Sequence, residues 1–454
     1  MVRAASVSKL TDLVLSISLK ASSIKMTNKI DFNSPQYKRS RSVYMAQCTF
    51  EYMLALLVTD AFLAKLLSHL GLDDTTIGII SSFITLAFVI QIFSLFLYKL
   101  KMPSKTVTLI FYPLSRLLFS SLYLIPFIPM GTTTVKVVVM CFILLAYACK
   151  YIVLNVLYKW ANTFVEPTKR ASYSATKEII SIAAGIVFTA VVGYVFDTME
   201  AGGNIKHGFI MIAILAFIIS VSDVLCLLFI KKEESAEEHR PKHFRDIIRN
   251  TLGNKNFRSV ILFTAIYNSA VYLTNGFLGT FKVNDLMISI FIVQLINIIG
   301  NVVRMAASKP FGYFSDKHSF ASGMAVALVF LSAGYVALIF TTPGTWLLIA
   351  LYTVLYSATL AGVNQNSYNI AYSYVDSDYI TEALAIKNCI GGLFGFFASL
   401  VGSRILKYVQ SNGNMLFGVR VYGQQLLAAI SLVLILAALF VMIFVVGKQK
   451  VMKQ

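Results

Sequence analysis

Hydrophobic residues follow one another in long runs along this chain, and short polar turns separate the runs. Each run is about 20 residues or longer, which is the length that an α-helix needs to cross a bilayer core roughly 30 Å thick. The pattern predicts about twelve transmembrane helices. Their approximate ranges are 46–70, 75–98, 105–128, 134–162, 171–198, 206–230, 257–282, 286–309, 320–341, 345–372, 380–408 and 421–446.

Composition supports an all-α polytopic membrane protein and argues against a soluble one. Of the 454 residues, 57% are hydrophobic and 13% are charged, whereas soluble domains carry about 25% charged residues. The five cysteines lie in or beside the apolar runs without paired spacing, which argues against a disulfide framework and against a zinc site. We expect no cofactor.

The net charge of +18 is distributed as in a membrane protein. About 30 of the 39 Lys and Arg residues fall on one side of the twelve-span arrangement, and this bias predicts that both termini are cytoplasmic. Arg404, Lys407 and Arg420 are exceptions on the opposite side. The partner is therefore expected to be the lipid bilayer and not nucleic acid. Frequent Lys and Ile favour a bacterial inner membrane.

Two polar segments divide the chain into domains. Residues 1–44 are predicted to be a cytoplasmic tail, because the apolar part is short and is interrupted by Lys9 and Lys20, unlike a signal peptide. Residues 1–25 could also be an upstream start that the working protein does not need. The charge-rich stretch 231–256 is predicted to be a cytoplasmic linker with a short helix over 242–251. The remaining predicted domains are six-helix bundles at 45–230 and 257–446, and a tail at 447–454.

The two halves share a weak internal repeat. The segment VEPTKRASYSATKEIISIAAG, from residue 165, matches VDSDYITEALAIKNCIGGLFG, from residue 375, at a constant offset. Lys177 thereby corresponds to Lys387, and Gly185 to Gly395. Chance similarity between two helix entries is the alternative. A parallel repeat of two six-helix bundles is typical of a large group of secondary transporters, whose site lies between the bundles at the midplane.

The loop KPFGYFSDKHSFASG between the eighth and ninth spans gives a more specific match. Gly312, Asp316 and Lys317 occupy the positions of a G-x-x-x-D-[RK] loop, and the chain resembles the major facilitator superfamily over residues 45–446. The resemblance implies two pseudo-symmetric six-helix bundles that work by alternating access, with this loop latching the cytoplasmic gate. A glycine there permits a tight helix-to-loop turn.

The entry to the fifth span resembles the same family, with Glu166 and Arg170 as candidate gate residues. The corresponding loop of the first half, YKLKMPSKT, has no such Gly or Asp, which leaves a latch in that half open to question. For both gate loops the alternative is ordinary positive-inside topology with helix capping.

Three ionisable residues lie near the middle of separate spans: Asp60, Arg116 and Lys150. Because hydrocarbon makes a charge expensive, we expect these side chains to face a shared polar cavity, although a static salt bridge is the alternative. Similarity to sugar porters of the superfamily implies that Asp60 pairs with Lys150 and couples transport to protons. Arg116 could hold an anionic group, pair with Asp60, or bond to carbonyls that Pro113 frees.

The other acids and the amides suggest different roles. Glu51 and Asp223 lie nearer the predicted cytoplasmic ends and are expected to snorkel or cap, and the role of Glu178 stays undecided. The second half carries polar stripes that can read hydroxyls or join helices. The candidate cavity residues there are Asn268, Tyr272, Asn275, Gln294, Asn297, Asn364 and Asn388. Gly391, Gly392 and Gly395 predict a face for close helix packing.

The function that fits best is a secondary active transporter, acting as a monomer in proton-coupled symport of a sugar, oligosaccharide or organic anion. A proton-antiport exporter of drugs or metabolites is the alternative within transport. A non-transporting receptor or scaffold on the same fold is the alternative of another class. An enzyme is not expected, since the chain has no G-x-S-x-G, H-E-x-x-H or Walker A segment.

Overall fold

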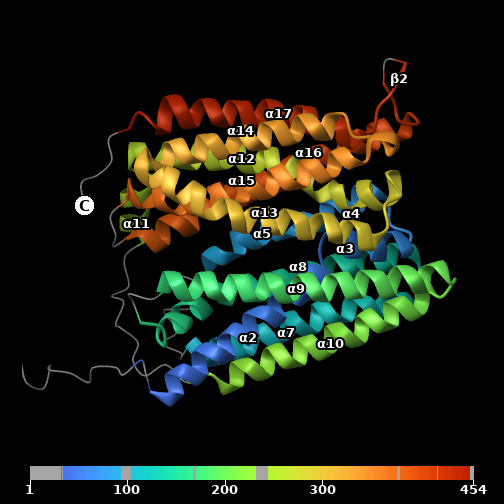
Figure 1. Ribbon diagram of the computed structural model, residues 1–454, viewed down its shortest axis with the longest axis horizontal. Helices are drawn as coiled ribbons and strands as arrows, with labels where there is room; N and C mark the ends of the chain where they lie inside the picture. Colours follow the sequence, from blue (N-terminus) through green and yellow to red (C-terminus); the bar gives the residue numbers. More distant parts are fainter. Residues whose placement is uncertain are drawn as a thin grey trace, which may run out of the picture.

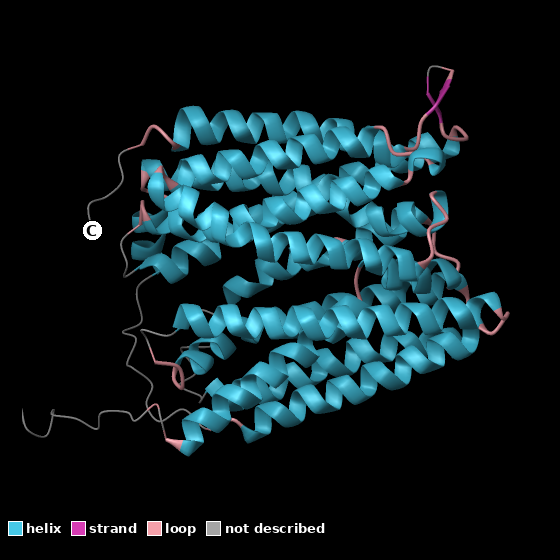
Figure 2. Cartoon of the chain, viewed as in Figure 1, coloured by secondary structure: helices cyan, strands magenta, loops and turns pink. Residues whose placement is uncertain are grey.

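The computed structural model describes residues 32, 34–93, 104–166, 170–231, 244–375, 379–416 and 418–449. These residues are almost all helical, and Figure 2 shows one small hairpin beside the helices. The hairpin pairs β1 (Met415–Leu416) with β2 (Val419–Arg420) in antiparallel register. The all-α prediction is confirmed.

The helices run along one long axis of the molecule (Figure 1). The helices of the first half are α2 (Pro35–Leu57), α3 (Asp60–His69), α4 (Asp74–Ser81), α5 (Phe83–Ile90), η1 (Gln91–Phe93), α7 (Ser104–Ser121), η3 (Leu122–Phe127), α8 (Thr132–Asn162), α9 (Arg170–Ala201) and α10 (Ile205–Phe229). Those that follow are α11 (Phe244–Thr251), α12 (Lys255–Thr280), η5 (Phe281–Asp285), α13 (Ile290–Lys317), α14 (Phe320–Ile339), η6 (Pro343–Thr345), α15 (Leu347–Tyr372), α16 (Ile380–Ser411), α17 (Gly423–Val441) and η8 (Met442–Val446).

Eleven helices of the described chain are long and apolar enough to cross a membrane. The predicted span at 46–70 is not among them because its helix is interrupted: α2 ends at Leu57 and α3 begins at Asp60. Asp60 itself has a φ of +48°, in the left-handed region that is uncommon for residues other than glycine. Counted with this broken first span, the helices agree with the twelve-span prediction.

Each half of the chain forms its own bundle (Figure 1). Helices α2 to α10 occupy the lower part of the view, and α12 to α17 occupy the upper part. The buried apolar side chains form one main core from residues 54–219 and another from residues 257–446, and only Ile290 and Ala61 join the core of the opposite half. Two separate cores allow the bundles to move as units.

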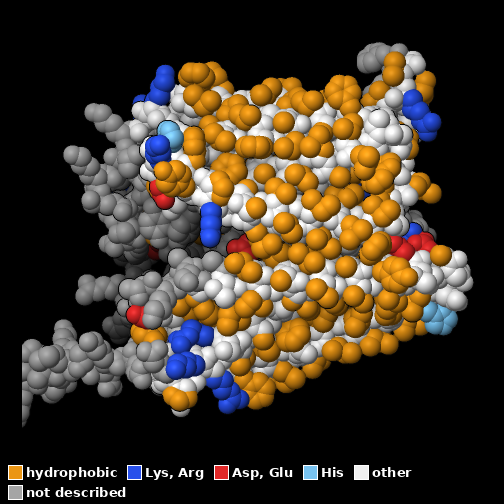
Figure 3. Space-filling view, viewed as in Figure 1, with side chains coloured by type: hydrophobic (Ala, Val, Ile, Leu, Met, Phe, Trp, Pro, Cys, Tyr) orange, Lys and Arg blue, Asp and Glu red, His pale blue; other side chains and the backbone are white. Residues whose placement is uncertain are grey.

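The two ends of the molecule are distinct. The end that carries α11 and the start of α2 is called here the α11 end, and the end that carries β1 and β2 is called the hairpin end (Figure 1). On the face shown in Figure 3, hydrophobic side chains cover the middle, and charged side chains gather toward these ends. Val187, Phe397 and Val433 are 65%, 61% and 66% exposed. Apolar exposure on this scale is expected where lipid covers the surface.

The predicted glycine face of α16 is confirmed. A Cβ on Gly392 would lie 2.5 Å from the backbone oxygen of Thr85 on α5. The absence of a side chain at Gly392 therefore lets α16 approach the backbone of α5 closely at the seam between the bundles. A Cβ on Gly395 would lie 2.8 Å from the ring of Tyr272 on α12. Such small residues let membrane helices approach closely.

Candidate functional site

An ion pair joins the two bundles on the hairpin side of the molecule. Lys282 Nζ, on η5, lies 3.0 and 2.9 Å from the two carboxylate oxygens of Asp60 on α3. Asn297 Nδ2, on α13, donates to the same carboxylate at 3.1 Å. Lys282 is 7% exposed, whereas Asp60 is 30% exposed. The Asp60 carboxylate is therefore held by the opposite bundle but is still reachable by water.

The chain around Asp60 is shaped for this contact. The break between α2 and α3 places Asp60 in the first turn of α3, where the amide groups at the helix start favour a negative charge. A Cβ on Gly279 of α12 would lie 2.8 Å from the Asp60 backbone oxygen, so the two helices touch without room for a larger residue. Strained backbone conformations of this kind cluster at functional sites.

Further polar contacts close the same side. Asn284 donates to Asp74 at 2.7 Å, and Gln410 donates to the other oxygen of Asp74 at 2.9 Å. The backbone amides of Ile290 and Phe291, at the start of α13, donate to Asp197 of α9 at 3.3 and 2.8 Å. The two bundles are therefore locked together at the hairpin end.

The predicted pairing of Asp60 with Lys150 is wrong. Lys150 Nζ instead lies 2.7 Å from Glu51 Oε1, and Arg116 Nε lies 2.7 Å from Asp223 Oδ2. Arg116 Nη2 also lies 3.4 Å from Glu51 Oε1. We call Glu51, Arg116, Lys150 and Asp223 the N-bundle charge cluster. Glu51 lies on α2, whereas Asp60 begins α3 beyond the break between these two helices.

The N-bundle charge cluster also corrects the predictions for its acids. Glu51 and Asp223 were expected to snorkel or cap, but they are 18% and 0% exposed and hold cations. The cluster has two acids and two bases, so its formal charges cancel. It joins α2, α7, α8 and α10 within one bundle, and Arg116 already lies between the carboxylates of Asp223 and Glu51.

Two neutral side chains complete this cluster. Gln47 Nε2 donates to Asp223 Oδ1 at 2.8 Å and to the Tyr112 hydroxyl at 2.7 Å, and Arg116 donates to the same hydroxyl. Buried charges are tolerated when their remaining hydrogen-bonding positions are filled in this way.

A cavity of about 170 Å³ lies where the second bundle meets α5 of the first. Helices α12, α15 and α16 supply most of its wall, and Phe88 comes from α5. The lining residues are Phe88, Phe263, Thr264, Tyr267, Asn268, Val363, Ser367, Lys387 and Asn388. We call this cavity the Lys387 pocket. It contains two of the predicted cavity residues, Asn268 and Asn388.

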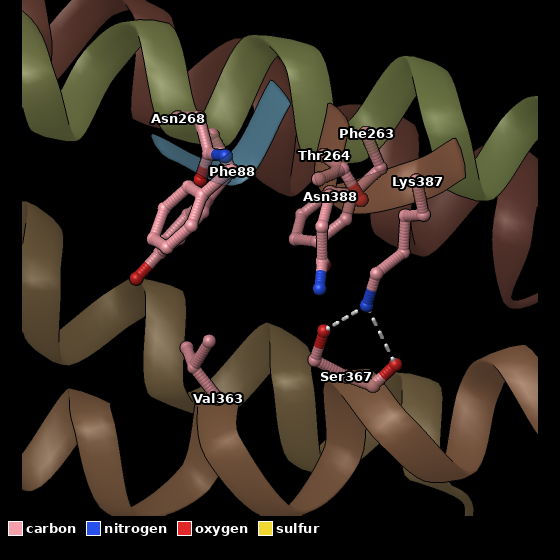
Figure 4. Close-up of a pocket in the computed structure, with 9 residues that line it drawn as sticks. Phe88, Phe263, Thr264, Asn268, Val363, Ser367, Lys387 and Asn388 are labelled. Atoms are coloured by element: carbon pink, nitrogen blue, oxygen red, sulfur yellow. Dashed lines mark hydrogen bonds between the residues drawn. The ribbon is translucent and has the colours of Figure 1, made fainter. Parts of the chain in front are cut away.

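Figure 4 shows the Lys387 and Asn388 side chains extending from α16 toward Ser367 on α15. Lys387 Nζ lies 2.8 Å from Ser367 Oγ and 3.3 Å from the Ser367 backbone oxygen, and donates to both. The residue is 5% exposed. The sequence identified Lys387 as the counterpart of Lys177 in the repeat, and the structure shows that it is buried in a cavity.

The other predicted cavity residues have different surroundings. Asn275 donates to the Tyr356 hydroxyl at 2.9 Å and accepts from the Tyr352 hydroxyl at 3.1 Å, so α15 already occupies its amide. Tyr272 packs on Gly395, and Gln294 is buried at 3% exposure where α13 meets α9. Asn364 is exposed. These positions do not form one continuous polar wall.

The predicted gate residues lie at the α11 end. Gly312, Asp316 and Lys317 are inside the last turns of α13, which ends at Lys317, so the expected turn at Gly312 is wrong. Asp316 and Lys317 are exposed. Glu166 is partly buried and has an interaction partner, and Arg170 begins α9 with a side chain outside the described residues.

A second ion pair joins the two bundles toward the α11 end. Arg304 Nη2 on α13 lies 2.9 Å from Glu178 Oε1 on α9.

The sequence of residues 44–399 matches the Major Facilitator Superfamily. The chain belongs to this superfamily of transporters. That match covers more than half of the chain and agrees with the twelve-span, two-bundle fold. Among curated proteins, no sequence is similar enough to count as a match.

Solved superfamily-type structures have the same fold. A mutant of the nucleoside transporter NupG has a TM-score of 0.70 at 15% identity, over 89% of this chain and 99% of that chain. A bacterial homolog of the human lysosomal transporter Spinster, inward-facing and unoccupied, has a TM-score of 0.65 at 11% identity, over 91% and 97%. An inward-facing bacterial homologue of the iron transporter ferroportin has a TM-score of 0.59 at 14% identity, over 90% and 97%.

The chain is thus a superfamily transporter whose seam carries an ion pair and a small cavity. Among the residues that the structure describes, no group of three or more His, Cys, Asp or Glu is placed to hold a metal ion.

Proposed function

We propose that this transporter carries a small polar solute by alternating access and couples its movement to protons through Asp60. The observation that carries the proposal is the ion pair between Asp60 and Lys282, because it crosses the seam between the bundles. A contact of this kind must break whenever the hairpin end opens.

Protonation gives a physical way to break this contact. The Asp60 carboxylate accepts hydrogen bonds from Lys282 and Asn297, and a proton on it would remove the charge that attracts Lys282. Since Asp60 is 30% exposed, a proton can reach it through water. A local charge change that biases two states of a mobile element is the general form of such switches.

The contacts at the hairpin end support a proposal about the conformational state of the transporter. The hairpin end is closed by Asp60, Asp74 and Asp197, so the Lys387 pocket is proposed to open toward the α11 end. The distribution of Lys and Arg predicts that this end is cytoplasmic. Asp316, which is exposed here, is proposed to find its latch partner when the α11 end closes in the opposite state.

The charges also bear on the solute. The N-bundle charge cluster is balanced, and the exposed carboxylate of Asp60 is held by Lys282. Organic cations need an acid that is available to them, so the structure favours a neutral or anionic solute and symport over export of cations.

Transport into proteoliposomes tests the proposal. Uptake is measured with and without an inward proton gradient for a panel of radiolabelled sugars, nucleosides and sugar acids, in wild-type protein and Asp60→Asn. We expect the gradient to drive accumulation of the solute by the wild type. In Asp60→Asn, accumulation should fall at least about tenfold, whereas exchange of solute across the membrane should remain.

The control is Glu178→Gln, since Glu178 also joins the bundles but is 54% exposed. The proposed coupling through Asp60 would be contradicted if Asp60→Asn accumulated solute like the wild type. It would also be contradicted if accumulation depended on a sodium gradient and not on a proton gradient.

A further inference from the structure

Lys387 is a buried cation without a carboxylate partner in the described part of the chain. The ion pairs found among the described residues involve Lys65, Arg116, Lys150, Lys282 and Arg304, and none involves Lys387. Its ammonium group has three hydrogen atoms to donate, and Ser367 takes two of them. A buried charge of this kind is costly unless an opposite charge reaches it.

The walls around Lys387 suit a small ring with hydroxyl groups. Phe263 and Tyr267 stack with ring centroids 5.9 Å apart, and Phe88 of the other bundle also lines the pocket. Aromatic rings cover the apolar face of such a solute, whereas amides donate to and accept from hydroxyls. Asn268 and Asn388 supply these amides. The volume of about 170 Å³ is below the 300–1,000 Å³ of most drug-sized sites, which favours a compact solute.

We propose that the Lys387 pocket selects solutes that carry an anionic group, either a carboxylate or a phosphate, on a small hydroxylated body. Lys387 binds the anionic group, Asn268 and Asn388 bind hydroxyls, and the aromatic rings cover the body. The proposal rests on the proposed function in one respect: it takes the cavity at the seam as the solute site of a transporter.

The position of Phe88 links binding to the movement of the bundles. Phe88 lies on α5 of the first bundle, and the remaining lining residues belong to α12, α15 and α16 of the second. A Cβ on Gly392 would lie 2.9 Å from Phe88 Cβ, so α5 and α16 are already in contact beside the pocket. A solute held by Lys387 therefore touches both bundles at once.

The test measures binding without transport. Full-length protein is purified in detergent, and its thermal unfolding midpoint is followed as galactose, galacturonate or galactose 6-phosphate is added up to millimolar concentration. The variants are Lys387→Gln, which removes the charge, and Lys387→Arg, which keeps it. Lys177→Gln is the matched control, because Lys177 corresponds to Lys387 in the repeat but lies 5.4 Å over the ring of Tyr44.

We expect galacturonate, galactose 6-phosphate or both to bind at least about tenfold more tightly than galactose in the wild type. Lys387→Gln should remove that preference, whereas Lys387→Arg and Lys177→Gln should keep most of it. Tighter binding of galacturonate would identify the anionic group as a carboxylate, and tighter binding of galactose 6-phosphate would identify it as a phosphate. Unfolding midpoints without ligand show whether each variant is folded.

The proposal is overturned if the wild type binds galactose as tightly as both acids, if it binds none of the three, or if folded Lys387→Gln keeps the preference. Binding that follows Lys387 in a protein that shows no proton-driven uptake would instead retain the anion site and reject the coupling through Asp60.

Discussion

The N-bundle charge cluster and the Asp60–Lys282 pair are both groups of charges at membrane depth, but they differ in what they join. The cluster connects α2, α7, α8 and α10 of one bundle, and Arg116 and Asp223 in it are 2% and 0% exposed. The pair connects α3 to η5 of the other bundle, and its acid is 30% exposed. Under the proposed alternating access, the first can stay intact while the bundles move, whereas the second must break.

This difference distinguishes charges that pair within one bundle from the pair to which we assign the proposed coupling. The cluster balances its two acids against its two bases within one bundle. The pair depends on how the bundles are placed, because each bundle supplies one of its charges, and its acid is exposed to water. Depth in the membrane does not distinguish the two uses.

The largest effect is expected from breaking the cluster. Arg116→Met leaves Asp223 buried without its cation, and the free energy of unfolding should fall by about 3–5 kcal/mol. The thermal unfolding midpoint and the yield of monodisperse protein measure this.

The double variant Arg116→Met with Asp223→Leu is the control. It removes both charges of one pair and leaves Glu51 with Lys150, so most of the lost stability should return. A single variant as stable as the wild type would show that the cluster does not hold the bundle together.

A smaller effect on folding and a large effect on transport are expected at the seam. A Cβ on Gly276 would lie 2.6 Å from the backbone oxygen of Gly78 on α4, and this backbone cannot move aside without moving the bundle. Gly276→Ala should therefore disfavour closure of the hairpin end and reduce uptake at least about tenfold.

Gly131→Ala is the matched control, since a Cβ there meets nothing within 4 Å. If Gly276→Ala transports as well as this control, the close approach at the hairpin end is not part of the transport cycle.

The smallest effect is expected at the exposed end of the seam. Glu178 is 54% exposed and Arg304 is 28% exposed, so their ion pair is screened by water and should contribute about 0–1 kcal/mol. Glu178→Gln should change uptake by no more than a few-fold in low salt and less in high salt. A loss comparable to that of Asp60→Asn would place the decisive contact at the α11 end instead.

The sequence predicted the number and position of the spans because hydrocarbon thickness dictates the length of each apolar run. It also predicted the glycine face of α16. It could not predict partners, because depth along a helix says nothing about which helix lies opposite. Asp60 and Lys150 were matched by depth, but the structure pairs Asp60 with Lys282, which is near a span end and drew no attention in the sequence.

Lys387 shows where a better signal existed. It was not among the predicted cavity residues, yet it lies seven residues after Ile380, the start of α16, which is about 10 Å into the helix. Asn268 and Asn388, by contrast, were predicted as cavity residues and do line the Lys387 pocket. Polar residues at membrane depth therefore indicated part of the pocket lining. The volume of the pocket and the single charge in it became visible only from the packing of α12, α15 and α16.

The most direct test of the account is the distance across each end of the seam when Asp60 is neutral. In a background without the five native cysteines, spin labels at Thr133 and Ser411 report the hairpin end, and labels at Lys38 and Lys255 report the α11 end. Distances are measured in wild type, Asp60→Asn and Lys282→Gln. We predict that both variants lengthen the hairpin-end distance and shorten the α11-end distance. Unchanged distances in both variants would contradict the claim that this ion pair holds the hairpin end closed.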